Sequence, residues 1–175
     1  MAGNPTERTA MYQNIVIALD GSHNATLALN EAIELAKVTG ARMIPVHVAS
    51  LRDISVEGVG MLGSHDLHTL AQTRGRDILA EAESEIRKAG LDKVETVIVE
   101  SWDGGKEMAR MLIDVARERG ADLIVLGTHG RAGLMNLLMG SFAETLLKVA
   151  TLPLLIVRNT HDDDEVKVFE KRPIL

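Results

Sequence analysis

The chain has 175 residues, of which 46% are hydrophobic and 25% charged, a balance typical of one soluble globular domain. Its net charge of −6 and its 2% of aromatic residues argue against nucleic acid as the main partner, because phosphates attract basic surfaces and bases stack on aromatic rings. The absence of cysteine excludes thiol chemistry, and because the sequence shows neither a membrane-spanning apolar run nor a secretory signal, we expect a cytoplasmic protein that does not insert into membranes.

A polar arm, residues 1–13, precedes the first predicted strand, Ile15–Leu19, and we expect this arm to be flexible. Ser22 or Asn24 can cap the helix that follows, because both side chains accept hydrogen bonds from the free N–H groups of a helix start. Apolar residues then recur at helical spacing as far as Gly40, which predicts that the helix ends there.

The second predicted strand is Met43–Ala49. Pro45 lies within it and lacks the N–H group of one ladder hydrogen bond, so the strand could bulge at that point. Residues 50–68 have the least regular pattern of the chain. A helix is predicted over residues 70–88, and it stops at Gly90.

The second half of the chain continues the alternation of strands and helices, and its tail, residues 159–175, has no clear period. The predicted elements are a strand at Val94–Val99, a helix with an apolar face from Met108 to Ala116, a strand at Leu123–Leu126, a helix that begins at Gly140 and Ser141, and a strand at Leu154–Val157. Alternating β and α elements with strands apolar on both faces predict one parallel sheet covered by helices on both faces. Ligands of such sheets bind beyond the carboxyl ends of the strands, where the strand order reverses.

Glycines punctuate the loop after the fourth predicted strand with the spacing Gly127-x2-Gly130-x9-Gly140-Ser141. Glycine lets a ligand approach the main chain, and the helix start at Gly140 and Ser141 offers free N–H groups and the positive end of a dipole to a phosphate. The segment is therefore a strand, a glycine-rich loop and an anion-seeking helix start.

This spacing resembles the nucleotide-binding signature of the universal stress protein family, in its ATP-binding branch. The resemblance covers residues 14–158, which we expect to form a single domain between the arm and the tail. It implies an open five-stranded sheet in the order 3-2-1-4-5, a Rossmann-like fold of the adenine nucleotide alpha hydrolase type. The order reverses between strands one and four, so the sheet pattern and the glycine motif indicate the same crevice.

The resemblance also implies roles for individual residues. Asp20, in the sequence Ala18-Leu19-Asp20, would contact the nucleoside, although Asp before Gly-Ser is also common as a turn residue. Val48 would contact adenine through its main chain, and we expect its neighbour His47 to be a packed strand histidine. The residues expected around the ribose and the phosphates are Gly127, Gly130, Arg131, Gly140, Ser141, Phe142 and Ala143.

Two of these positions depart from the family pattern, which often has Val and then a small, sometimes hydroxylated residue. Phe142 either crowds the site or packs, and Ala143 lacks a hydroxyl for a phosphate. Arg131 either screens phosphate charge or is a solvated loop cation.

The sequence context of three other motifs argues against a binding role for them. The GxGxxG match at residues 58–63 lies well past the second strand instead of opening a helix directly after it. Gly105-Lys106 is followed by Glu107, so a Walker A motif is absent. The acidic run at residues 161–165 is typical of a solvated tail, and no transition-metal site is predicted.

The sequence favours an ATP-binding, stress-response regulatory protein, with Mg²⁺ held mainly by the phosphates and with hydrolysis slow or absent, because no general base is evident. We expect a homodimer paired through the apolar edge strand Leu154–Val157, and a regulated protein partner remains open. The alternatives are an enzyme of the related nucleotide-binding class, using a residue such as His129, a binder of cyclic AMP or AMP, and a nucleotide-free interaction module.

Overall fold

The computed structural model describes residues 11–56, 63–128 and 141–158. The strands are β1 (Asn14–Ala18), β2 (Arg42–Ser50), β3 (Val97–Ser101), β4 (Leu123–Gly127) and β5 (Leu154–Val157), and the helices are α1 (His23–Thr39), α2 (Leu51–Ile54), α3 (Ser64–Lys88), α4 (Gly105–Glu118) and α5 (Ser141–Val149). All neighbouring strands pair in parallel, and their order is β3-β2-β1-β4-β5. The expected open parallel sheet and its strand order are confirmed.

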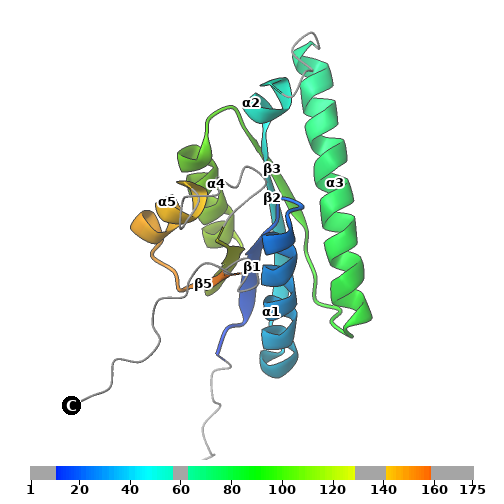
Figure 1. Cartoon of the computed structure of the whole chain (residues 1–175). Coiled ribbons are helices and arrows are strands. Elements are labelled where there is room, and N and C mark those ends of the chain that lie inside the picture. The colour runs from blue at the N-terminus through cyan, green and yellow to red at the C-terminus, as the bar shows by residue number, and fades with distance from the viewer. Residues whose placement is uncertain (1–10, 57–62, 129–140, 159–175) are drawn as a thin grey trace, which may run out of the picture.

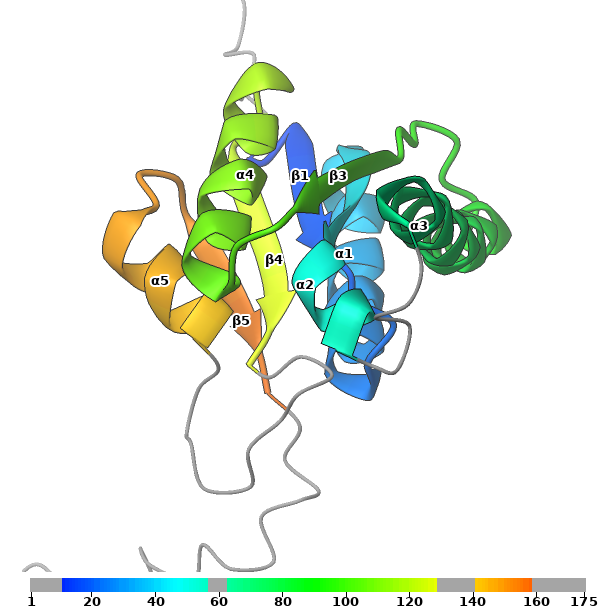
Figure 2. The ribbon, with the colours of Figure 1, turned by 90° about the horizontal axis from the view of Figure 1, so that it is seen from above.

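Helices cover both faces of this sheet. Figure 1 shows α1 and α3 on one side and α4 and α5 on the other, and Figure 2 shows the same division from above. Alternate residues of β1 supply the two cores, since Ile15 and Ile17 pack under α1 and α3 whereas Val16 packs under α4 and α5. Because both faces are covered, the central strands are apolar on both sides.

Local signals in the sequence set the helix ends. Ser22 caps α1, because its hydroxyl accepts the N–H of Ala25 at 3.2 Å, which resolves the choice between Ser22 and Asn24. Gly90 has a φ of 82° beyond the end of α3, and Leu91 N–H donates to Ile86 O across the turn. This left-handed glycine after the helix is the termination that the sequence predicts.

The third strand begins later than predicted, at Val97 instead of Val94. Met43 N–H donates to Lys93 O and Glu95 N–H donates to Met43 O, so the β2–β3 ladder starts correctly at an isolated bridge between Met43 and Val94. Every second residue of a strand faces the same neighbour, so the next donor toward β3 is Pro45, which has no N–H group. The ladder is therefore interrupted there, and regular pairing resumes at Val46 and Val97. The other strands lie within one residue of their predicted bounds.

Within residues 50–68, the expectation of an irregular segment was wrong at 51–54 and from Ser64 onward, where the chain is helical. The short helix α2 follows β2 directly, with the Ser50 hydroxyl accepting the N–H of Asp53, and α3 begins at Ser64, well before residue 70. In the added turns Leu67 is buried, at helical spacing from the buried Ala71, which is a signal that the polar residues around Leu67 obscure.

Candidate functional site

The end of β1 holds a carboxylate at the carboxyl edge of the sheet. Asp20 Oδ1 accepts the N–H of Ser22 at 2.9 Å, and Gly21 between them has a φ of 77°. The turn role that the sequence allowed for Asp20 is therefore present, and it fixes the half-buried carboxylate at the point where β1 meets α1. A carboxylate held in this way accepts hydrogen bonds from hydroxyl groups.

The end of β2 contributes main-chain groups to the same edge. Leu19 N–H donates to Val46 O at 2.9 Å, and β1 ends there while β2 continues to Ser50. Because main-chain hydrogen-bonding groups alternate in direction along a strand, those of Val48 point to the same side as Val46, beyond the end of β1. Val48 therefore presents its backbone on the side of β2 that β1 no longer covers.

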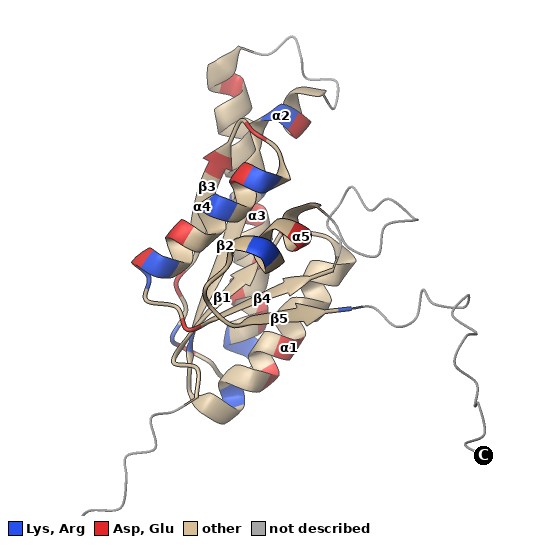
Figure 3. Cartoon of the chain, turned by 90° about the vertical axis from the view of Figure 1, so that its left-hand side faces the viewer, with Lys and Arg blue, Asp and Glu red and all other residues tan. Residues whose placement is uncertain are grey.

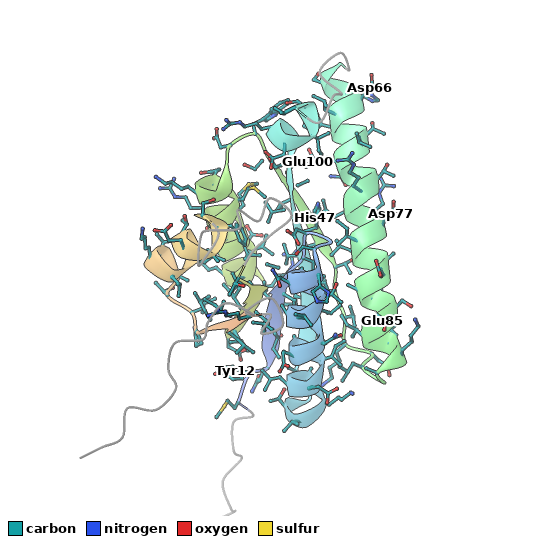
Figure 4. All side chains as sticks on the ribbon, in the orientation of Figure 1. Tyr12, His47, Asp66, Asp77, Glu85 and Glu100 are labelled. Carbon is teal, nitrogen blue, oxygen red and sulfur yellow. The ribbon has the colours of Figure 1, made fainter. Side chains whose placement is uncertain are left out.

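His47 is a packed strand histidine, as the sequence predicts. It is 8% exposed, and its Nδ1 donates to Leu19 O at 2.8 Å. A carbonyl oxygen only accepts, so this contact assigns the proton to Nδ1. Figure 4 shows His47 between the sheet and α3, where it supports the chain just before Asp20.

Gly127 at the end of β4 lies against the first turn of α1. A Cβ atom at this position would stand 2.8 Å from Asn24 O and 2.9 Å from Asn24 C and Cβ. Ile17 pairs with Val125 in parallel, so β1 and β4 end at the same edge of the sheet. Gly127 thus belongs to the same edge as Asp20, and its first structural role is close packing.

The helix starts of α4 and α5 meet on the other face of the sheet, beside each other in Figure 2. A Cβ atom on Gly105 would lie 2.6 Å from Ser141 Oγ and 3.2 Å from Phe142 N. The two starts border a hollow of about 350 Å³. Its lining residues are Asp103, Gly104, Gly105, Lys106, Glu107, Arg110 and Ser141.

The side chains of Phe142 and Ala143 turn toward the core. Phe142 is half-buried and packs with the cluster under α4 and α5, and Ala143 is 2% exposed. Of the two options for Phe142, packing is the one observed. The first N–H groups of α5 carry the positive end of its dipole beside the hollow.

The structure brings Ala18, Leu19, Asp20, Val48 and Gly127 together at the carboxyl edge of β1, β2 and β4, and it places Ser141 with Phe142 and Ala143 at the start of α5. Gly130, Arg131 and Gly140 lie outside the described residues, as do His129, the acidic run and all of the GxGxxG match except Gly63, which immediately precedes α3. Sequence reasoning missed Gly105, Lys106 and Asn24 as neighbours of the site. The glycine pair at the start of α4 is the available signal, although by its sequence alone it is only a failed Walker A motif.

The charges around the hollow have both signs. Figure 3 shows basic and acidic residues interleaved along α4, and Arg110 pairs with Glu107 at 3.6 Å. On α5, the hydrogen bond from Lys148 lowers the pKa of Glu144, and the charge of Lys106 adds to this effect. Lys106 is thus a cation that lines the hollow.

Neither a metal cluster nor a membrane span is found in the described parts of the chain. Within those ranges, no group of three or more His, Asp or Glu side chains lies close enough together to hold a metal ion. The helices there are too short or too polar to cross a bilayer.

Comparison with known proteins gives a consistent result. The model of the universal stress protein family matches residues 11–158. Universal stress protein MJ0531 of Methanocaldococcus jannaschii is 32% identical over 149 residues, which cover 85% of this chain and 83% of that protein.

Two solved structures extend the likeness to the fold. The protein MJ0577, whose structure served to assign its biochemical function, is 26% identical with a TM-score of 0.70, over 85% of this chain and 97% of that one. The universal stress protein from Archaeoglobus fulgidus in complex with dAMP is 25% identical with a TM-score of 0.57, over 84% of this chain and 98% of that one.

Proposed function

The chain belongs to the universal stress protein family, and from this premise we propose that it binds ATP, with Mg²⁺, beyond the carboxyl ends of β1 and β4. The observation that carries the proposal is the convergence of Asp20, the backbone of Val48 and Gly127 at the point where the strand order reverses. In this proposal the nucleotide changes the surface that a regulated partner protein meets during a stress response.

Each group at the edge has a part in holding the nucleotide. Asp20 accepts hydrogen bonds from the ribose hydroxyls, and the backbone of Val48 meets the edge of adenine. The N–H groups at the start of α5, from Ser141 onward, face the phosphates, where the helix dipole favours negative charge. Gly130 and Gly140 complete the phosphate-binding loop by their place in the sequence motif, and Arg131, next to Gly130, screens phosphate charge in this proposal.

The magnesium ion in this proposal is held by phosphate oxygens, because the described part of the chain offers no cluster of ligands for it. Bound there, it neutralises phosphate charge. We assign no residue as a general base, so the protein acts by binding and any hydrolysis is slow.

A second candidate ligand is AMP. It is favoured by the Archaeoglobus fulgidus relative, which was solved with dAMP. A monophosphate uses the same Asp20 and Val48 and needs less from the region of Phe142 and Ala143, where a hydroxyl side chain is absent.

We also propose that two copies pair through β5. This strand is at the edge of the sheet, and Leu155 on it is 36% exposed. On the neighbouring α5, Leu147 and Val149 are 51% and 44% exposed. An apolar edge strand beside an apolar helix face is covered when a second copy pairs with it.

The test is calorimetric titration of ATP, AMP and cyclic AMP, each with Mg²⁺, into the protein and into Asp20→Asn. Loss of a charged hydrogen-bond acceptor to the ribose weakens binding by about 10- to 100-fold. The matched control is Glu34→Gln, which neutralises an exposed carboxylate on α1 that pairs with Lys37 at 2.6 Å. We expect the control to bind as the unchanged protein does.

Micromolar binding of ATP that Asp20→Asn weakens and Glu34→Gln does not would support the proposal. Tighter binding of AMP or cyclic AMP would replace ATP as the ligand and keep the site. If the folded protein gives no heat with any of the three nucleotides, the hypothesis of nucleotide binding is wrong. The alternative of a nucleotide-free interaction module would then remain.

A further inference from the structure

A polar cluster outside the proposed nucleotide site joins α3 to the end of β3. The Glu100 carboxylate accepts a hydrogen bond on each oxygen, from His68 Nδ1 on Oε2 and from Gln72 Nε2 on Oε1 at 2.6 Å. The ring of His68 also meets Trp102 edge-on, with ring centroids 6.1 Å apart and an interplanar angle of 82°. The Glu100 side chain is 18% exposed and that of His68 45%. We call His68, Gln72 and Glu100 the Glu100 clasp.

The clasp lies on a part of the fold whose apolar cluster is small. This part, the α2–α3 arm, consists of α2 and residues 64–75 of α3, and Figure 1 shows it at the end of the molecule where α2 lies. Its apolar contacts form a small cluster apart from the two main cores, made of Ala49, Leu51, Ile54, Leu67 and Ala71. The second half of α3, in contrast, packs into a main core through Leu79, Ala82 and Ile86.

We propose that the Glu100 clasp is a proton-controlled latch, which tightens the α2–α3 arm on the sheet when His68 is protonated and loosens it when His68 is neutral. Histidine exchanges its proton near neutral pH. A charged imidazole donating to a carboxylate makes a hydrogen bond about twice as strong as a neutral one. Because Glu100 is the more buried partner and also accepts from Gln72, it stays in place to meet either form of His68.

Other charged groups lie on the elements around His68. They include Arg52 and Asp53 on α2, His65, Asp66 and Arg74 on α3, and Asp103 after β3. Among the described residues, His68 forms its ion pair with Glu100 and its ring meets Trp102. His65 and Asp66 pair with each other at 3.7 Å and are 93% and 60% exposed, so solvent screens their charges. Glu100 is therefore the group that decides the effect of the proton.

Figure 4 shows Glu100 and Asp66 at the same end of the molecule, with His47 further along the sheet. The arm packs against His47, which supports the chain before Asp20. A Cβ atom on Gly75 would lie 3.0 Å from His47 Cδ2, and His47 donates to Leu19 O beside Asp20. A loosened arm would change the packing against His47 and so the support of Asp20. Only this effect on the nucleotide site rests on the proposed function. The latch itself needs no nucleotide.

The experiment is amide hydrogen exchange of the full chain from about pH 5.5 to 8.5, corrected for the intrinsic pH dependence of exchange, with the His68 imidazole followed by NMR over the same range. Peptides from residues 64–75 report the arm, and those from 78–88 serve as the internal reference. The variants are His68→Gln, which keeps a donor but does not titrate, and Glu100→Gln, which removes the carboxylate. His65→Gln is the matched control.

We expect protection of residues 64–75, relative to 78–88, to rise about three- to fivefold on acidification, with the midpoint of the His68 NMR titration. His68→Gln and Glu100→Gln should abolish this rise and His65→Gln should keep it. A pH-independent ratio in the unchanged protein, or a rise that persists in His68→Gln, would overturn the proposal. ATP titrations at both ends of the pH range test whether the latch affects the nucleotide site. If the protein does not bind ATP, the proposed function fails, and the hydrogen-exchange result still decides whether the latch exists.

Discussion

Replacing Gly127 with alanine tests whether the first position of the motif requires glycine for packing or for binding a ligand. The added Cβ would stand 2.8 Å from Asn24 O and 2.9 Å from Asn24 C, both of them main-chain atoms in the first turn of α1. These atoms cannot rotate away as the end of a side chain can. Either α1 or the end of β4 must therefore move.

The expected cost follows from this geometry. Gly127 is not among the glycines with positive φ, so the penalty arises from overlap and not from backbone strain. Overpacking of this kind costs about 1–3 kcal/mol, and the smaller entropy of an unfolded chain with alanine returns about 0.4–1 kcal/mol. A net loss of about 1–2 kcal/mol lowers the melting temperature of a chain of this size by about 2–8 °C.

The assay is thermal unfolding by circular dichroism, with Gly104→Ala as the matched control. Gly104 lies at the same edge of the sheet, has a φ of −77°, and would bring no atom within 4 Å of a new Cβ. The control should melt close to the unchanged protein, and Gly127→Ala should also bind ATP more weakly because the start of α1 carries Asp20 with it.

Equal melting temperatures for Gly127→Ala and Gly104→Ala would refute the packing argument. If Gly127→Ala were then stable but unable to bind nucleotide, the glycine would be required by the ligand instead. If it were stable and bound normally, neither role would hold.

Three further predictions use other parts of the structure. Leu146→Ala removes a fully buried side chain between α5 and the sheet, so urea unfolding should show a loss of about 2–5 kcal/mol, and a loss below 1 kcal/mol would contradict the packing seen here. Ser141→Ala should weaken ATP binding about tenfold and AMP binding less, and equal effects on both nucleotides would remove Ser141 from the terminal phosphates. The pKa of Glu144 is lowered in the folded state, so its contribution to stability is present above its unfolded pKa and is lost as the pH falls through the folded value. Because this pair is exposed to solvent, Glu144→Gln should melt as the unchanged protein does between pH 7 and about pH 4, and a clear difference at pH 7 would show that the pair is stronger than a surface pair.

The sequence by itself determined the elements and their arrangement in the sheet. Apolar periodicity and the glycines that end helices are local signals, since they depend on residues within one or two turns of each other. Alternation of strands and helices then leaves few parallel topologies, and the family resemblance selected the order that the structure has. Local rules failed where a neighbour intervened, as when Pro45 of β2 delayed the start of β3.

Tertiary structure alone decided which residues meet. Asn24 lies against Gly127, Gly105 lies against Ser141, and His68 reaches Glu100 across 32 positions of sequence. The periodicity of a segment indicates which of its faces is apolar, but it does not indicate which other segment will cover that face. The packing role of Phe142 and the latch at Glu100 come from such long-range contacts, because burial and hydrogen-bond partners exist only once the helices lie on the sheet.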